Sequence, residues 1–261
     1  MRILLTNDDG INARGLHALL HELNTIAEIY LAAPRTEQSG TGHSITVFDP
    51  IKAVEARIPG IKKGWLIGGT PVDCVKLATK RLISEPIDLV VSGINHGSNM
   101  GTDVLYSGTV SAATEGVIMG YPAIAISLDT YDDSADFSFA AAFTRRLVTA
   151  MLKETMPRNT LFNVNLPLLP PEHIKGIRMT KLGHRNYDNL FEERRDPRGN
   201  VYYWLGGGVL NEDQDEDSDV YAVSQGYISI TPIHLDLTHY GLIKKFNKLS
   251  QEYLNDLMRG E

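Results

Sequence analysis

The segment MRILLTNDDG at residues 1–10 decides the fold class, because it joins a short apolar run directly to two adjacent carboxylates. Residues Arg2–Thr6 predict a buried β-strand, and the turn that ends it is predicted at residues 7–10. Leucines then recur at helical spacing, at Leu16, Leu19, Leu20 and Leu23. A strand, a polar turn and a helix in this order are typical of the first unit of an α/β fold with a parallel sheet.

The same alternation continues along the chain. Further strands are predicted at Ile29–Ala33, Ile87–Val91, Ala123–Leu128 and Leu161–Leu166, and further helices from Thr70, from about Thr109 to Met119, and at Phe137–Lys153. The strands are continuously apolar, which indicates a sheet covered on both faces. We therefore predict a single domain over residues 1–261, whose first 170 or so residues form a doubly wound, mostly parallel α/β core.

The remaining part, from about residue 171 to 261, is less regular. Short β-prone segments occur at Arg178–Leu182, Val201–Leu205 and Tyr227–Thr231, and an amphipathic helix is predicted at His239–Met258. The acidic run at residues 211–219 (NEDQDEDSD) predicts an exposed surface loop, as charge runs usually do. We interpret this part as an arm with a final helix, suited to oligomerisation.

The composition narrows the classes of protein. Apolar residues make up 43% of the chain and charged residues 22%, a balance typical of a folded globular protein. The net charge of -7 argues against binding of nucleic-acid polymers or anionic membranes, and a small anionic substrate would need a local positive centre such as a metal ion. Cys74 is the one cysteine, which excludes an internal disulfide and a CxxC zinc site. Without a signal peptide or a long apolar span, a cytoplasmic location is expected.

The first polar cluster is the turn at residues 7–10. Asp8 and Asp9 repel each other there, and a divalent cation would relieve that repulsion, since carboxylate oxygens suit Mg²⁺, Mn²⁺ or Ca²⁺. The alternative is a structural turn whose aspartates cap the next helix. The residues alone leave both interpretations open.

The second cluster, PRTEQSGTGHSIT at residues 34–46, is rich in hydroxyls and glycine and follows the second predicted strand. Such a loop can surround an oxyanion or give a hydroxyl ligand to a metal. Without further context, an ordinary flexible loop is the better interpretation.

The third cluster is SGINHGSNMGTDVLYSGTVSAATEG at residues 92–116, between a predicted strand and a predicted helix. Residues 107–109 (Ser-Gly-Thr) start that helix and suit a phosphate site, because a helix N-terminus offers unpaired N–H groups. Asn95 and Asn99 can add amide donors or acceptors. A long capped connection is the alternative. All three clusters follow predicted strands, so they can converge at the carboxyl edge of the sheet.

In order and spacing, these segments closely resemble the SurE family, the stationary-phase survival proteins that act as 5′/3′-nucleotidases. The matching segments are ILLTNDDG at 3–10, AAPRTEQSGTGHSIT at 32–46 and the whole third cluster, with weaker support from GTPVDCVKLA at 69–78 and YISITPI at 227–233. The resemblance implies a Rossmann-like core. It also implies a homodimer or homotetramer whose C-terminal arms are exchanged between subunits.

The resemblance further implies one divalent cation per subunit, Mg²⁺ or Mn²⁺. Its ligands would be Asp8, Asp9, Ser39 and Asn95. The substrate-binding residues would be Asn95, Asn99, Ser107, Gly108 and Thr109, and the catalytic residues Asp8, Asp9, Asn99 and Ser107. The implied reaction is hydrolysis of nucleoside 5′- and 3′-monophosphates, and of short polyphosphate, by in-line attack of a water that the metal activates.

Three alternatives compete with this reaction. A covalent aspartyl-phosphate mechanism needs an aspartate-x-aspartate pair, whereas Asp8 and Asp9 are adjacent. A receiver-like signalling module needs a phosphorylatable aspartate after a later central strand, but Ile87–Val91 ends in serine and glycine. Nucleotide binding without turnover stays open. The sequence does not select the preferred nucleotide, the metal, the number of subunits or the general base.

Overall fold

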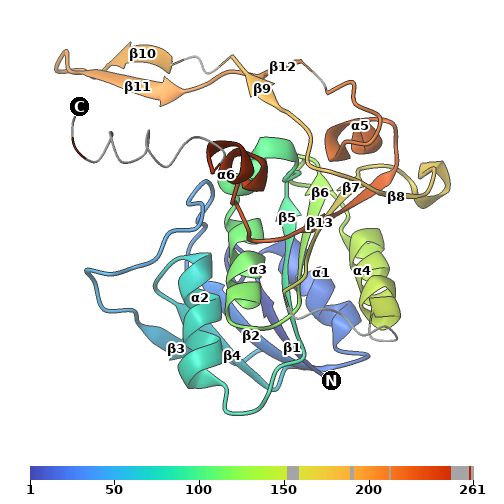
Figure 1. Cartoon of the computed structure of the whole chain (residues 1–261). Coiled ribbons are helices and arrows are strands. Elements are labelled where there is room, and N and C mark those ends of the chain that lie inside the picture. The colour runs from blue at the N-terminus through green and yellow to red at the C-terminus, as the bar shows by residue number, and fades with distance from the viewer. Residues whose placement is uncertain (152–158, 189–190, 212, 248–258, 260–261) are drawn as a thin grey trace.

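The fold is built on one large sheet. A computed structural model describes residues 1–151, 159–188, 191–211, 213–247 and 259. The strands of the large sheet are β1 Arg2–Thr6, β2 Glu28–Pro34, β3 Ala53–Glu55, β4 Lys63–Ile67, β5 Leu89–His96, β6 Ala123–Asp129, β7 Leu161–Pro167, β8 Ile177–Met179 and β13 Ile228–Ile233. They lie in the order β3-β4-β2-β1-β5-β6-β7-β13-β8 (Figure 1).

Six neighbouring strands, from β4 to β7 in that order, run parallel. The chain first moves outward from β1 to β2 and β4, and then returns to place β5 on the other side of β1. The strand order therefore reverses between β1 and β5, where ligands bind in folds of this kind. In the register, Thr6 at the end of β1 lies opposite Ser92 of β5. The predicted doubly wound, mostly parallel α/β fold is confirmed.

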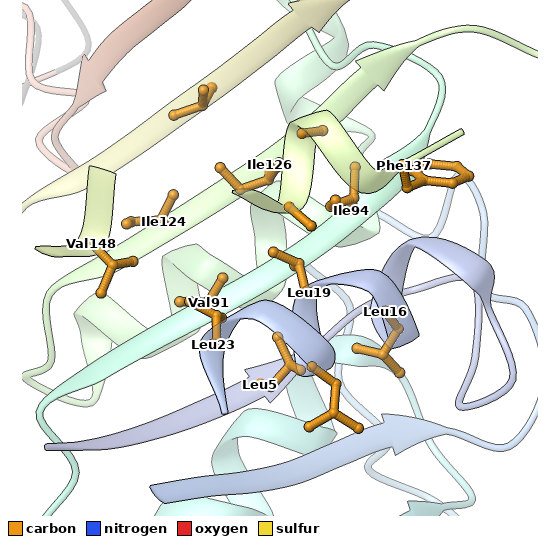
Figure 2. Packing of buried hydrophobic residues seen from close by; sticks show 14 of the residues in the cluster. Leu5, Leu16, Leu19, Leu23, Val91, Ile94, Ile124, Ile126, Phe137 and Val148 are labelled. Atoms are coloured by element: carbon orange, nitrogen blue, oxygen red, sulfur yellow. The ribbon is translucent and has the colours of Figure 1, made fainter. Parts of the chain in front are cut away.

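Helices cover both faces of the sheet. Helices α1 (Arg14–Leu23) and α4 (Ser138–Met151) lie on one face, and α2 (Pro71–Leu77) and α3 (Gly108–Ile118) lie on the other (Figure 1). Figure 2 shows the first of the two resulting cores, where Leu16, Leu19 and Leu23 of α1 pack toward Leu5 and Val91 of the sheet. Both cores support the strand ends that carry the polar clusters.

Two of the predicted helix starts are confirmed by their caps. The Thr70 hydroxyl accepts the N–H of Asp73 at 3.1 Å, and the Asp73 carboxylate accepts the N–H of Thr70 at 2.9 Å, so α2 begins with a capping box and Pro71. Ser107 caps α3 in the same way, accepting the N–H of Val110 at 3.1 Å. Local capping chemistry thus sets where both helices begin.

Strand β5 is longer than the predicted segment Ile87–Val91. After an irregularity between Ser92 and Asn95, its pairing with β6 resumes, so the strand ends at His96. The first residues of the third cluster are therefore part of the sheet. This places Asn95 at the carboxyl end of β5.

The C-terminal part contributes both to the sheet and to an arm. β13 pairs with β7 and β8, while β9 (Asn186–Tyr187) pairs with β12 (Val209–Asn211), and β10 (Phe191–Arg195) forms a hairpin with β11 (Val201–Leu205). Figure 1 shows that hairpin extending beyond the body of the molecule. Since β8 and β13 lie in the large sheet, the division near residue 170 stays a prediction.

Short helices complete the chain: α5 Asp219–Ser224 and α6 Tyr240–Phe246, with single turns at Ala78–Leu82, Gly101–Leu105 (η2) and Pro171–His173. Of the predicted final helix His239–Met258, α6 forms the start, and residues 248–258 lie outside the described residues, as do the last two positions predicted for α4. Across the described ranges, no helix has the length and apolar character needed to cross a membrane.

Candidate functional site

The three polar clusters meet in one pocket at the carboxyl ends of β1 and β5. The pocket has a volume of about 1030 Å³ and is lined by residues from each cluster, among them Asp8, Ser39, Asn95, Asn99 and Ser107. It lies where the strand order reverses, as expected for a ligand site in a doubly wound sheet. Asp8 and Ser107, which are 99 positions apart in the sequence, therefore share one cavity.

Asp8 is held in this pocket by the start of α3. Its side chain is buried, and the Thr109 hydroxyl donates a hydrogen bond to its Oδ1. A methyl group at Gly108 would lie only 2.7 Å from the Asp8 Cβ, so glycine is required for this close approach. Burial raises the pKa of Asp8 because it disfavours the charged carboxylate, and a positive partner would favour that charged form again.

Asp9 lies beside Asp8 and is half-buried, and its pKa is raised as well. Burial, and then repulsion from Asp8, raise the pKa of Asp9 to about 7, although the His96 N–H donates to its Oδ2 at 3.4 Å. No Lys, Arg or His among the described residues forms an ion pair with either carboxylate. The N-cap residue of helix α1 is Ala13, and no side chain caps this helix, so the alternative in which these aspartates cap it is wrong.

The loop that carries Ser39 is held against both neighbouring clusters. The Gln38 N–H donates to the backbone carbonyl of Asp8 at 2.8 Å. Farther along the loop, the His43 Nε2 lies 3.0 Å from the Glu115 carboxylate, which is buried within α3. These contacts keep Ser39 at the pocket beside the paired acids.

Two of the predicted metal ligands make other contacts. The exposed Ser39 hydroxyl donates to Glu37 at 2.7 Å, and the Asn95 amide nitrogen donates to the Gly97 carbonyl at 2.7 Å. With its nitrogen engaged, Asn95 has its amide oxygen left for a cation or a substrate group. Ser39 lines the pocket, and its hydroxyl oxygen keeps lone pairs that a cation could use while the hydroxyl donates to Glu37.

The donor set fits a hard divalent cation. Nowhere in the described chain do three His, Cys, Asp or Glu side chains come together in a metal-binding arrangement, so a cation here would depend on hydroxyl and amide oxygens as well as carboxylates. The oxygens would come from Asp8, Asp9, Ser39 and Asn95. An all-oxygen set with two acids suits Mg²⁺ or Mn²⁺ and would compensate the buried negative charge.

The N-terminus of α3 reaches the pocket at Ser107. Ser107 is the cap residue, and Gly108 and Thr109 are the first two helical positions, whose N–H groups have no partner within the helix. Such a terminus attracts anions through these groups and through the helix dipole. It begins immediately beside Asp8, so a phosphate there could contact the helix and the cation together.

Asn99 is buried, and both its side chain and its backbone are hydrogen-bonded within the protein. Its side-chain nitrogen donates to the Ser127 hydroxyl at 2.9 Å, and its backbone carbonyl accepts from Asn163 at 2.7 Å and from Asn165 at 3.0 Å. Its amide nitrogen is thus engaged inside the protein. Asn99 also lines the pocket, where its side-chain oxygen can accept a hydrogen bond, and its role toward the substrate stays a prediction.

Comparison with known proteins identifies the family. The profile described as "Survival protein SurE" matches residues 3–189. The chain is 65% identical over 253 residues to "5'-nucleotidase SurE" of Syntrophomonas wolfei, covering 97% of this chain and 96% of that one. The chain belongs to the SurE family.

Other SurE proteins support the same assignment. "5'-nucleotidase SurE" of Heliobacterium modesticaldum is 52% identical over 94% of this chain and 90% of its own. The crystal structure of SurE protein from Aquifex aeolicus aligns with a TM-score of 0.82 at 38% identity, covering 98% of this chain and 100% of the other. The likeness therefore includes the C-terminal part as well as the core.

This SurE chain also places arm residues in the pocket, which the sequence did not indicate. The Arg185 guanidinium donates to Asp103 at 3.1 Å and to Ser98 at 3.1 Å, and the Tyr187 hydroxyl donates to Asp103 at 2.6 Å. Asp103 lies in η2, the turn that leads to Ser107. Asp103 belongs to the third cluster quoted from the sequence, but Arg185 and Tyr187 carry no motif that could have identified them.

Asp219 corrects the prediction made for the acidic run. The run was expected to be exposed, but Asp219 is buried, and its carboxylate accepts the N–H groups of Gly101 at 2.9 Å and Gly183 at 2.8 Å. Burial raises its pKa. One carboxylate thereby connects the start of η2 to the base of the arm. Its place after Ser218 and before the apolar residues of α5 is the local signal that distinguishes it from the rest of the run.

Proposed function

We propose that this protein is a 5′-nucleotidase that hydrolyses nucleoside 5′-monophosphates to nucleosides and phosphate. The names of its SurE relatives support this activity. The observation that carries the proposal is a pair of carboxylates without a cationic partner, the buried Asp8 and the half-buried Asp9, beside the N-terminus of α3. The carboxylate pair would bind a cation, and the helix N-terminus would bind an anion.

The proposed roles follow from this arrangement. Asp8, Asp9, Ser39 and Asn95 would hold one Mg²⁺ or Mn²⁺. When bound, this cation would neutralise substrate charge and act as a Lewis acid toward the phosphoryl group. The N–H groups of Gly108 and Thr109 would bind the phosphoryl oxygens, with Ser107 as a further polar contact, and the side-chain oxygen of Asn99 would accept a hydrogen bond from a hydroxyl of the substrate. A water would attack in line, opposite the departing nucleoside oxygen.

Finer aspects of the function belong to the same proposal. We expect 3′-nucleotides and short polyphosphate as further substrates, and a homodimer or homotetramer with exchanged arms. The exposed apolar side chains of the β10–β11 hairpin, with Trp204 61% and Leu205 68% accessible, support packing of the arm against another copy. The cytoplasmic location expected from the sequence stays a prediction.

Phosphate release from AMP, measured with Mn²⁺, with Mg²⁺ and with a chelator, tests the proposal. Turnover should depend on the metal, and Asp8→Asn should lower it by several orders of magnitude, because one buried ligand is lost. Asp133→Asn, which changes an exposed aspartate, is the matched control. Full activity of Asp8→Asn would refute the metal assignment, and a trapped phosphoenzyme would favour the covalent alternative. Binding of AMP without any turnover would reduce the protein to a nucleotide-binding module.

A further inference from the structure

The pocket is much larger than a phosphate and a cation require. Its volume of about 1030 Å³ is slightly above the range, roughly 300–1,000 Å³, of pockets that take up whole organic ligands. Besides the polar residues around Asp8, its lining includes three largely exposed aromatic residues: Phe191 of the arm hairpin, and Tyr106 and Tyr131 of the core. Tyr106 is 69% accessible and Tyr131 is 81% accessible. Exposed aromatic surface inside a ligand pocket needs an occupant.

Tyr131 is positioned by the backbone that follows Asn95. A methyl group at Gly97 would lie 2.9 Å from Cε1 and 3.3 Å from Cζ of the Tyr131 ring, so the ring lies directly over that glycine. The carbonyl of Gly97 accepts the Asn95 amide, and the His96 ring centroid is 6.3 Å from that of Tyr131. The ring is therefore supported on one side by the metal-site strand, while most of its surface stays accessible.

Tyr106 lies farther along the third cluster, nine residues after Gly97 and immediately before Ser107. Its N–H donates to the Asp103 carbonyl at 2.9 Å, and its own carbonyl accepts the Gly42 N–H at 3.0 Å. These bonds hold the backbone from both sides, while the side chain projects into accessible space. A fixed backbone with an exposed ring is the geometry of a binding surface that exists before the ligand arrives.

We propose that Tyr106 and Tyr131 form the nucleobase subsite of this pocket, where the base of a nucleoside monophosphate stacks on tyrosine. This inference rests on the proposed nucleotidase activity. Stacking uses the face of the base, which every nucleobase has, so the subsite accepts different bases and favours the larger purines. The phosphate is then bound by α3 and the base by the two rings of the same cavity.

Kinetics with and without a base test this subsite. The substrates are AMP and ribose 5-phosphate, which share the phosphate ester but differ in the base. Tyr106→Ala and Tyr131→Ala should each raise KM for AMP about tenfold, as loss of one stacking contact does, with little change in kcat. Their kinetics with ribose 5-phosphate should stay at the wild-type level. Phenylalanine at either position should restore AMP binding, and Phe48→Ala, which removes a fully exposed aromatic ring outside the pocket, is the control.

Adenosine supplies an independent measurement, because it has the base without the phosphate. It should inhibit ribose 5-phosphate hydrolysis by the wild type competitively, and about tenfold more weakly in either alanine variant. Equal losses with both substrates, or unchanged AMP kinetics, would overturn the subsite. A changed subunit number in the variants, measured by light scattering, would assign the rings to contact with a second copy instead. If the wild type hydrolyses neither ester, the nucleotidase proposal itself fails, and with it the subsite.

Discussion

The contact between Gly108 and Asp8 provides a sharp test of how the site is built. Gly108 is the first residue of α3, and a Cβ there would lie 2.7 Å from the Asp8 Cβ and 2.8 Å from its Oδ2. Asp8 cannot turn away freely, because it is buried and bonded to Thr109. Gly108→Ala should therefore move the carboxylate and the helix terminus apart.

The size of this displacement follows from the distances. The 2.7 Å separation is about 0.7 Å short of the 3.4 Å at which ordinary van der Waals contact begins. A shift of about 1 Å in a reacting or positioning group can reduce catalysis by about 100-fold, so we expect kcat/KM for AMP to fall roughly 10- to 100-fold. Overpacking lowers the free energy of unfolding by about 1–3 kcal/mol, partly offset by the better helix propensity of alanine.

Gly116→Ala is the control that distinguishes an effect on the site from a general effect of overpacking. Gly116 lies in the same helix, and its added methyl would lie 2.9 Å from the Val90 Cβ in the core, away from Asp8. Both variants should lose comparable stability in urea denaturation, but Gly116→Ala should keep its activity per folded molecule. It should also bind Mn²⁺ normally in calorimetry, whereas Gly108→Ala should bind it more weakly. Equal activities of the two variants would show that the close approach of Gly108 to Asp8 has no part in catalysis.

Two further outcomes are expected. Because burial raises the folded pKa of Asp9 to about 7, above its value in the unfolded chain, its contribution to the stability of the metal-free protein is complete below about pH 4 and is lost as the pH rises through 7. In chelator, the melting temperature of the wild type should therefore fall relative to that of Asp9→Asn between pH 5 and 8, and parallel pH profiles would contradict the assignment. Asp219→Ala should lower the free energy of unfolding by about 2–5 kcal/mol, because it leaves the buried N–H groups of Gly101 and Gly183 without an acceptor. Urea denaturation measures this loss, and a value under about 1 kcal/mol would contradict the role of Asp219.

The parts of the fold that the sequence predicted are those decided by neighbouring residues. Continuous apolar runs marked the strands of the parallel sheet, and Thr70 and Ser107 marked helix starts because capping involves residues only three positions apart. The convergence of the polar clusters was predictable for a related reason. In a parallel sheet, every strand brings its carboxyl end to the same edge, so residues just after strands share a location whatever their separation in the chain.

The features that escaped prediction depend on contacts between distant segments. β5 continues to His96 because β6 offers pairing partners, which its own sequence does not reveal. Asp219 looked like the rest of an acidic run, yet it is buried because α5 packs beside η2 and the arm. Arg185 is an ordinary arginine in the sequence, and only its contact with Asp103 gives it a place at the pocket.

These long-range contacts share a location, which explains why the arm belongs to the same functional unit as the core. The turn η2 runs from Gly101 to Leu105 and leads to Ser107. Its first residue is bound by Asp219, and its Asp103 is bound by Arg185 and Tyr187, all from the C-terminal part. The backbone carbonyl of Asp103 accepts the N–H of Ser107 at 3.1 Å. A single hydrogen bond therefore connects the residue that the arm holds, Asp103, to the start of α3. The position of the N-terminus of α3, where we propose that phosphate binds, therefore depends on the arm as directly as on the sheet beneath it.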